Sequence, residues 1–240
     1  MRLDKYLANN TSLSRKQVKT VIKHGGVLID GAHCTNAAQH IDPTSVIELD
    51  GEQIEERGPG YFMLNKPEGV VCANSDADYP TVFDFLEEDH PGLHVAGRLD
   101  LDTTGLVLIT GDGNWSHRLT SPKYKCVKRY RVLAAEFITD KMITKLESGV
   151  YIGKEKKRTA PAMTERISDD EIFLMITEGR YHQVKQMFAA VGNAVDSLHR
   201  ESIGDIELDP DLAPGEYRPL TQAEVASVGK VASQESIEDA

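Results

Sequence analysis

Residues 94–109 read His-Val-Ala-Gly-Arg-Leu-Asp-Leu-Asp-Thr-Thr-Gly-Leu-Val-Leu-Ile. An arginine and two carboxylates, Arg98, Asp100 and Asp102, stand there among small and hydroxyl residues. The four apolar residues 106–109 are typical of a buried strand. A polar loop beside a buried strand is a common place for an active site, because a rigid scaffold then positions the polar side chains. It is equally a common place for a turn closed by a salt bridge, and these residues alone leave both interpretations open.

Outside this stretch, strands dominate and helices are interspersed among them. Apolar runs predict strands, and amphipathic runs predict helices. The predicted strands cover 61–64, 106–109, 130–133 and 172–176, with Val95 in a further one, and the predicted helices lie near 82–88, 114–120, 140–148 and 182–191. Because the two kinds of element do not alternate regularly, we expect an α+β fold with a mixed, mainly antiparallel sheet.

The first 52 residues form a pattern of their own. Leu3, Tyr6 and Leu7 have helical spacing, and Ser14 with Gln17 forms a capping box at the start of a second helix. Short strands near 27–29 and 46–49 follow, each ending in an Asp-Gly turn. Residues 53–60 are mostly polar, end in Gly-Pro-Gly and predict a linker.

We therefore expect three parts. Residues 1–58 are a small α/β domain with its linker, residues 59–228 are the larger α+β domain, and residues 229–240 are an acidic flexible tail.

The charge is unevenly distributed. The chain of 240 residues has a net charge of −11, but residues 201–240 hold ten acids and only two bases. Two basic stretches, 15–24 and 118–131, lie in the remainder. Because the local field attracts a phosphate backbone, the net charge does not exclude nucleic-acid binding. Such clusters are also common on solvated faces.

Several classes of chemistry find no support in the sequence. Phosphate-binding glycine loops, the serine-hydrolase elbow and zinc-binding motifs do not occur. Cys34, Cys72 and Cys126 lie far apart, so we interpret them as small, at least partly buried side chains. We expect no metal and no cofactor. We also expect a cytoplasmic protein without a membrane contact, because the chain shows neither a secretory signal nor a run of about 18–20 apolar residues.

Two further segments carry candidate functional residues. In residues 178–188, the donors Arg180, His182 and Lys185 stand at a strand-to-helix junction, which suits an anion. In residues 128–131, Tyr130 stands among cations, as in proteins that stack a base and hold phosphates. An exposed basic helix start and a half-buried strand tyrosine are the simpler interpretations.

Several of these motifs together resemble a known family. Residues 1–50 resemble an S4-type RNA-binding module. Gly97-Arg98-Leu99-Asp100, ending in Thr104-Gly105-Leu106, resembles the signature loop of pseudouridine synthases of the RsuA/RluA superfamily. Further segments resemble the RsuA branch, which acts on small-subunit ribosomal RNA: 61–67, 115–122, 178–188, 198–201 and 212–220. The likeness covers roughly residues 1–228 and keeps one order along the chain.

The resemblance implies an enzyme that isomerises a specific uridine of 16S ribosomal RNA to pseudouridine without cofactor or metal. It implies that Asp100 is the catalytic carboxylate, that Lys185 pairs with it, that Tyr130 packs on the target base and that Arg98 contacts RNA. Asp102 does not match the catalytic position and is interpreted as structural. Many members of the superfamily have Arg in place of Lys185, and a lysine supplies a point charge without a bidentate fork.

For RNA binding we expect a set of cations in the N-terminal module and two donors in the larger domain: Arg2, Lys5, Arg15, Lys16, Lys19, Lys23, Arg180 and His182. The expected partner is small-subunit ribosomal RNA, or its assembly intermediate with ribosomal proteins, bound by a monomer. Two alternatives stay open, namely a synthase for large-subunit RNA and a catalytically inactive RNA-binding or ribosome-assembly factor. The target uridine and the attacked atom, uracil C6 or ribose C1′, also stay open.

Overall fold

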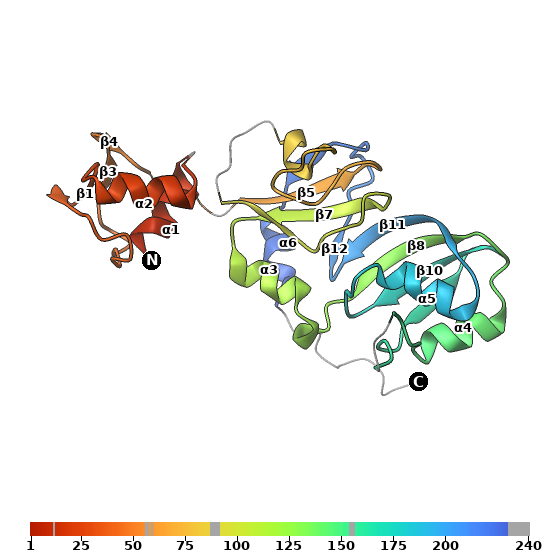
Figure 1. Ribbon diagram of the computed structural model, residues 1–240. Helices are drawn as coiled ribbons and strands as arrows, with labels where there is room; N and C mark the ends of the chain where they lie inside the picture. Colours follow the sequence, from red (N-terminus) through yellow and green to blue (C-terminus); the bar gives the residue numbers. More distant parts are fainter. Residues whose placement is uncertain (12, 56–57, 59, 87–91, 154–156, 230–240) are drawn as a thin grey trace. The chain divides into compact units, whose positions relative to one another are not determined.

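The computed structural model describes residues 1–11, 13–55, 58, 60–86, 92–153 and 157–229. The chain divides into two compact units (Figure 1). The smaller unit comprises Met1–Gly60, Leu86–His94 and Thr110–Asp112, and the larger one comprises Tyr61–Phe85, Val95–Ile109 and Gly113–Ala240.

The small unit is built from two helices and a four-stranded sheet. The helices are α1 (Leu3–Asn10) and α2 (Arg15–Lys23), and the sheet has the order β2-β1-β3-β4. The strands are β1 (Val27–Ile29), β2 (Ala32–His33), β3 (Ile47–Leu49) and β4 (Glu52–Gln53). The Ser14–Gln17 capping box forms as predicted, and the apolar helix faces meet the sheet in one core that includes Leu3, Leu7, Ile22 and Ile47.

The predicted linker begins too early. Gln53 belongs to β4, and the Ile54 amide donates to the Ile47 carbonyl at 2.8 Å. The Tyr6 hydroxyl also donates to the Ile54 carbonyl at 2.8 Å. The hydrogen-bonded backbone of the small unit therefore includes residues 53 and 54, the first two of the predicted linker. Residues 56, 57 and 59 of that linker lie outside the described residues.

The larger unit is organised around one twisted sheet of nine strands. Its main path has the order β13-β5-β7-β11-β8-β10-β9, with β12 on β11 and β6 on β7. The strands are β5 (Tyr61–Lys66), β6 (His94–Ala96), β7 (Thr104–Thr110), β8 (Lys128–Ala134), β9 (Met163–Arg166), β10 (Glu171–Ile176), β11 (Val195–Ile203), β12 (Ile206–Glu207) and β13 (Tyr217–Pro219). β11 and β7 run parallel, and the other pairs of described register in this sheet are antiparallel. The predicted α+β class with a mixed, mainly antiparallel sheet is confirmed.

Four α-helices and two 3₁₀ turns accompany this sheet in the described residues. The helices are α3 (Gly113–Thr120), α4 (Asp140–Glu147), α5 (Gln183–Val191) and α6 (Gln222–Ser227). The helix predicted near 82–88 is only a 3₁₀ turn over Val82–Phe85, where Asp84 accepts from the Thr81 amide at 2.7 Å. Within the described part of the chain, no helix has the length and apolar character needed to cross a membrane.

The sequence interpretation missed β11, which lies in the middle of the large sheet (Figure 1). Its nine residues include two carboxylates, a histidine and an arginine, so they lack the apolar run that marks the other strands. Arg200 of this strand is nevertheless 2% exposed. Hydrogen bonds from its guanidinium to two backbone carbonyls compensate for the burial of its charge in the middle of the sheet.

Candidate active site

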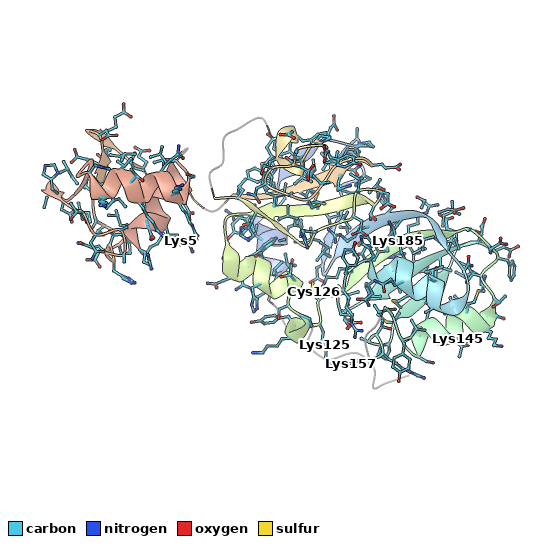
Figure 2. The ribbon with its side chains drawn as sticks, in the orientation of Figure 1. Lys5, Lys125, Cys126, Lys145, Lys157 and Lys185 are labelled. Carbon is cyan, nitrogen blue, oxygen red and sulfur yellow. The ribbon has the colours of Figure 1, made fainter. Side chains whose placement is uncertain are left out.

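One pocket of the larger unit gathers all six candidate residues of that unit. It is lined by Arg98 and Asp100 from the loop before β7, by Tyr130 from β8, and by Arg180, His182 and Lys185 around the start of α5. Residues separated by more than 80 positions thus meet at one place. Figure 2 shows Lys185 on α5 beside the central strands. The Lys5 side chain, also labelled there, lies on α1 of the small unit.

Two basic side chains approach Asp100. His182 Nε2 lies 3.4 Å from Asp100 Oδ1, and Lys185 Nζ lies 4.0 Å from Asp100 Oδ2. The Asp100 carboxylate is 31% exposed, so solvent and substrate atoms can reach it. These two basic side chains can pair with the Asp100 carboxylate, and an ionised carboxylate is a nucleophile.

The closest carboxylate to Lys185 is not Asp100. The Lys185 ammonium donates a short hydrogen bond to Asp102 Oδ1, and this bond holds the pKa of Asp102 below its usual range. Lys185 therefore bridges the two carboxylates of the loop, and the simple Asp100–Lys185 pair that we expected is incomplete. The sequence did not indicate this arrangement, because Lys185 lies 83 residues from Asp102 and the fold decides which carboxylate it meets.

A buried lysine shapes the same loop. Lys66, at the end of β5, is fully buried, and its ammonium donates to the carbonyls of Thr103 at 2.7 Å, Pro67 at 2.9 Å and Leu101 at 3.3 Å. Burial lowers the pKa of Lys66, because desolvation disfavours the charged form. The carbonyls that follow Asp100 are thus drawn to one positive centre, which fixes the turn that carries the carboxylate.

A buried arginine holds both ends of the loop. Arg200 Nη2 donates to the Gly97 carbonyl at 2.7 Å, before Asp100, and Nε donates to the Leu106 carbonyl at 2.8 Å, after it. Nη1 lies 3.4 Å from the Tyr130 hydroxyl. Gly105 lets the two strands approach, because a Cβ there would lie 2.3 Å from the Arg200 carbonyl oxygen. Arg200 therefore connects the loop that carries Asp100 to Tyr130.

Arg180, which we expected to bind RNA, donates hydrogen bonds to groups within the chain. Its guanidinium donates to the carbonyls of Lys157 at 3.1 Å and Arg158 at 2.8 Å, and it also lies 3.3 Å from the Glu178 carboxylate. These bonds tie the turn before α5 to the segment around residue 158. The RNA-binding role of Arg180 stays a prediction, and the structure adds an internal anchoring contact.

The expected RNA-binding cations of the small unit lie at its surface. Arg2, Lys5, Arg15, Lys16, Lys19 and Lys23 are all exposed. Only Arg2 has a described ion pair among these six, a bidentate contact with Asp4 at 3.0 and 2.7 Å. Four of the six follow one another along α2, which concentrates positive charge on a single short helix.

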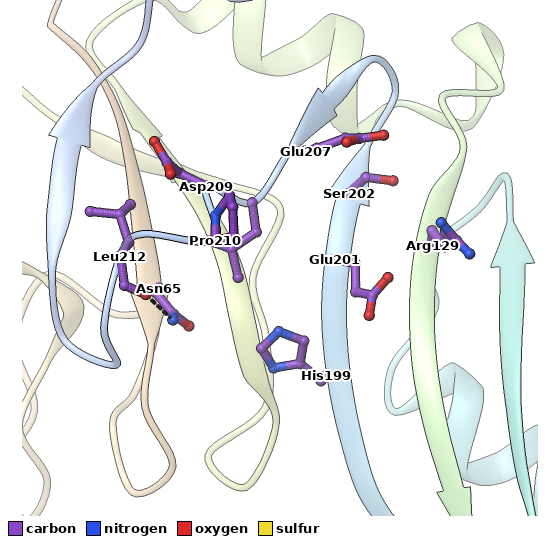
Figure 3. A pocket seen from close by; sticks show the side chains of 10 residues that line it. Asn65, Arg129, His199, Glu201, Ser202, Glu207, Asp209, Pro210 and Leu212 are labelled. Atoms are coloured by element: carbon purple, nitrogen blue, oxygen red, sulfur yellow. Dashed lines mark hydrogen bonds between the residues drawn. The ribbon is translucent and has the colours of Figure 1, made fainter. Parts of the chain in front are cut away.

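A second, polar pocket lies on the other face of the sheet (Figure 3). Its strand residues include Arg129, His199 and Glu201, which alternate with Tyr130 and Arg200 and therefore point away from Asp100. Burial lowers the pKa of His199, whose Nδ1 lies 2.8 Å from the Thr104 hydroxyl. Among the described residues, no group of three or more acidic, histidine or cysteine side chains could hold a metal ion. The three cysteines are free, and Cys34 and Cys72 are buried as predicted.

Comparisons with known proteins agree with this geometry. Residues 60–190 match the family model for RNA pseudouridylate synthase, and residues 1–47 match the model for the S4 domain. The ribosomal small subunit pseudouridine synthase A of Yersinia pestis is 51% identical over 231 residues, which is 95% of this chain and 98% of that protein. The protein of the same name from Escherichia coli K12 is 51% identical over 230 residues, covering 95% and 100% of the two chains.

A solved structure described as a crystal structure of pseudouridylate synthase has 46% sequence identity and a TM-score of 0.70. The match covers 95% of this chain and 99% of that one. The resemblance of the signature loop and of the N-terminal module is thereby confirmed. The chain belongs to the RNA pseudouridylate synthase family and carries an S4 domain at its N-terminus.

Proposed function

We propose that this chain isomerises a specific uridine of 16S ribosomal RNA to pseudouridine, with Asp100 as the catalytic carboxylate and without metal or cofactor. Two relatives named for the small ribosomal subunit are 51% identical across nearly the whole chain, which supports this substrate. The observation that carries the mechanism is the position of Asp100, at 3.4 Å from His182 and 4.0 Å from Lys185 in one pocket with Tyr130.

The reaction needs a carboxylate and little else. The bond between uracil N1 and ribose C1′ breaks, the base turns, and C5 bonds to C1′; C5 loses its proton and N1 gains one, so substrate and product are isomers. An ionised Asp100 adds either to uracil C6 or to ribose C1′, and both routes return the carboxylate at the end. The target must be unpaired or flipped, because a stacked and paired base cannot reach the pocket.

The neighbouring residues have distinct roles in this proposal. Lys185 contacts both carboxylates of the loop, and its hydrogen bond to Asp102 holds the pKa of Asp102 below its usual range. The ring of Tyr130 is nearly buried and provides a wall on which the uracil packs. Arg98 is exposed at the pocket and holds an RNA phosphate. His182 adds a second basic group beside Asp100 and contacts the RNA there.

The small unit supplies affinity in this proposal. Exposed cations attract the phosphate backbone without reading its sequence, and the six cations of α1, α2 and the N-terminus supply that charge. We also propose that the enzyme acts as a monomer in the cytoplasm, on small-subunit RNA or on an assembly intermediate with ribosomal proteins.

The test of the catalytic assignment is Asp100→Asn in the purified full chain. We expect turnover of uridine in small-subunit RNA to fall about 10⁴-fold or more, because the amide is no nucleophile. RNA affinity should stay nearly unchanged, since the two side chains have the same size. The matched control is Asp102→Asn, which removes the neighbouring carboxylate and should retain measurable turnover. Turnover near wild type in Asp100→Asn would refute the assignment.

The substrate is tested by mapping pseudouridine in the ribosomal RNAs of a strain that lacks the gene. We expect one site to disappear from small-subunit RNA and to return with the wild-type gene but not with Asp100→Asn. Loss of a site in large-subunit RNA alone would favour the sibling enzyme. An unchanged map, together with a defect in subunit assembly, would favour an inactive assembly factor.

A further inference from the structure

The rim of the active site carries an exposed aromatic ring. Tyr181 is 77% exposed, the highest fraction among the large hydrophobic residues described as exposed. Its ring stacks on the His182 ring, with centroids 3.8 Å apart and an interplanar angle of 19°. His182 Nε2 in turn lies 3.4 Å from Asp100 Oδ1. A continuous contact therefore runs from the catalytic carboxylate through two stacked rings to solvent.

The turn that carries these rings is firmly held. Gln186 Nε2 donates to the Tyr181 carbonyl at 2.6 Å, and the Arg180 amide donates to Gln183 Oε1 at 2.9 Å. His182 has φ 47° and ψ 38°, a left-handed conformation that few residues other than glycine adopt. This conformation places the two successive rings face to face. Because the turn is already ordered, little further entropy is lost when another ring stacks on Tyr181.

Two cationic residues are attached through their backbone to the turn that carries Tyr181. The Arg180 guanidinium binds the carbonyls of Lys157 and Arg158, so these two residues are anchored to that turn. Both have exposed side chains, and the Arg158 guanidinium lies over the Tyr151 ring, 5.2 Å from its centroid. An aromatic surface next to exposed cations is the arrangement with which proteins bind single-stranded nucleic acid, because bases stack on the ring while cations hold phosphates.

We propose that Tyr181 stacks the unpaired base next to the target uridine and so holds the neighbouring nucleotide in place while the uridine lies at Asp100. The inference rests on the proposed function, since it requires an RNA strand in this pocket. The open face of Tyr181 offers a π surface, so the platform accepts any base. It contributes to RNA binding more than to the chemical step, because Tyr181 does not reach the reacting atoms.

The experiment compares Tyr181→Ala with the matched control Tyr181→Phe, which keeps the ring and removes only the hydroxyl. The RNA is the small-subunit segment that carries the mapped uridine, with a fluorescent end label. We expect the dissociation constant to rise about 10-fold for Tyr181→Ala and to change less than about 2-fold for Tyr181→Phe. The rate at saturating RNA should change less than the affinity. Thermal unfolding checks that both variants keep the wild-type stability.

Abasic RNA identifies the stacked nucleotide. The base is removed on the 5′ side or on the 3′ side of the target uridine, and each RNA is tested with wild type and Tyr181→Ala. On one of the two sides, the abasic RNA should bind wild type as weakly as Tyr181→Ala binds intact RNA, and the two changes together should cause no further loss. If base removal and Tyr181→Ala each weaken binding, and their effects multiply when combined for both the 5′ and the 3′ abasic RNA, the proposal is overturned.

Two further outcomes are informative. If Tyr181→Ala binds the RNA with wild-type affinity, Tyr181 stacks no base and the proposal is overturned. A loss seen only with an assembly intermediate, and not with naked RNA, would also overturn it, in favour of a contact with a ribosomal protein. These measurements record binding, so a failure of the platform leaves the proposed function standing. Failure of the proposed function shows instead in the conversion assay, as RNA that wild type does not convert.

Discussion

The two units place their positive charges in opposite environments. In the small unit, the cations of α1 and α2 are exposed to solvent. In the larger unit, Lys66, Lys128 and Arg200 are buried and donate to backbone carbonyls, as Lys128 does to Cys126 at 2.8 Å. The first group presents charge to a partner, whereas the second group organises the chain around the pocket. In the proposed function, the same residue types thus serve RNA binding in the small unit and architecture in the larger one.

The energetics of the two groups differ accordingly. A buried cation loses its hydration, and its hydrogen bonds must compensate for that loss. Removing it leaves carbonyl oxygens without donors, which costs about 1–3 kcal/mol for each unsatisfied group. An exposed cation is hydrated in both the folded and the unfolded chain, so its replacement hardly changes the free energy of unfolding. Substitutions in the two groups should therefore separate stability from RNA binding.

The largest effect on stability is expected at Arg200. Arg200→Met removes the donors to Gly97 and Leu106 and should lower the free energy of unfolding by about 2–4 kcal/mol. The matched control is Arg131→Met on the neighbouring strand, where an arginine that is 51% exposed pairs with Glu171. That change should stay within about 1 kcal/mol. Urea unfolding measures both, and equal losses would contradict the architectural role of Arg200.

A smaller loss is expected for Lys66→Met, about 1–3 kcal/mol, because methionine fills the space but removes the ammonium donor from the carbonyls of Thr103 and Pro67. Turnover should fall as well, since the loop that carries Asp100 becomes less fixed. The pKa of folded Lys66 is lowered. Wild type should therefore gain stability relative to Lys66→Met as the pH rises from that lowered pKa toward the unfolded value of about 10.4. Urea unfolding at pH 7 and pH 9.5 checks this sign, and a gain for the variant would contradict it.

These buried cations also mark the limit of sequence interpretation. Local patterns predicted the Ser14–Gln17 capping box and the apolar strands, because neighbouring residues decide them. The burial of Lys66 depends on the Thr103 carbonyl 37 residues away, and that of Arg200 on the Leu106 carbonyl 94 residues away. Every residue has a backbone carbonyl, so residue type does not show which carbonyls will accept from a distant cation. The strand β11 was missed because its polar residues interrupt the apolar run that marks the other strands.

The pocket was predicted only in part, and through the family resemblance. It is lined by Asp100, Tyr130, Lys185 and Arg98, as the family resemblance implied. The hydrogen bond from Lys185 to Asp102 and the contact of His182 with Asp100 could not be predicted. Both depend on the left-handed turn at His182, which sets where the first residues of α5 point. Such a backbone conformation is uncommon for any residue other than glycine, so the sequence gave no clear indication of it here.

Arg218 is an intermediate case, because it is partly buried and its partners are carboxylates. Its guanidinium donates to both Glu224 oxygens at 2.9 and 3.0 Å, which lowers the pKa of Glu224 to about 2. The folded pKa lies below the unfolded one, so this stabilisation is complete above pH 4.5 and is lost as the pH falls toward 2. After allowance for solvent screening, wild type should exceed Glu224→Gln by about 1–2 kcal/mol at pH 6. Urea unfolding at pH 6 and pH 3 should show the difference shrinking, and a constant difference would contradict the ion pair.

The smallest effect on stability, and a clear one on RNA, is expected for the exposed lysines. Lys16→Gln with Lys19→Gln on α2 should change the free energy of unfolding by no more than about 0.5 kcal/mol. The slope of log affinity against log salt should nevertheless become shallower by about 1.5, because two phosphate contacts are lost. The matched control is Lys141→Gln with Lys145→Gln on α4, which removes the same net charge from two exposed positions of the larger unit. Equal salt slopes for the two double variants would show that net charge alone attracts the RNA, and that the concentration of cations on α2 makes no binding face.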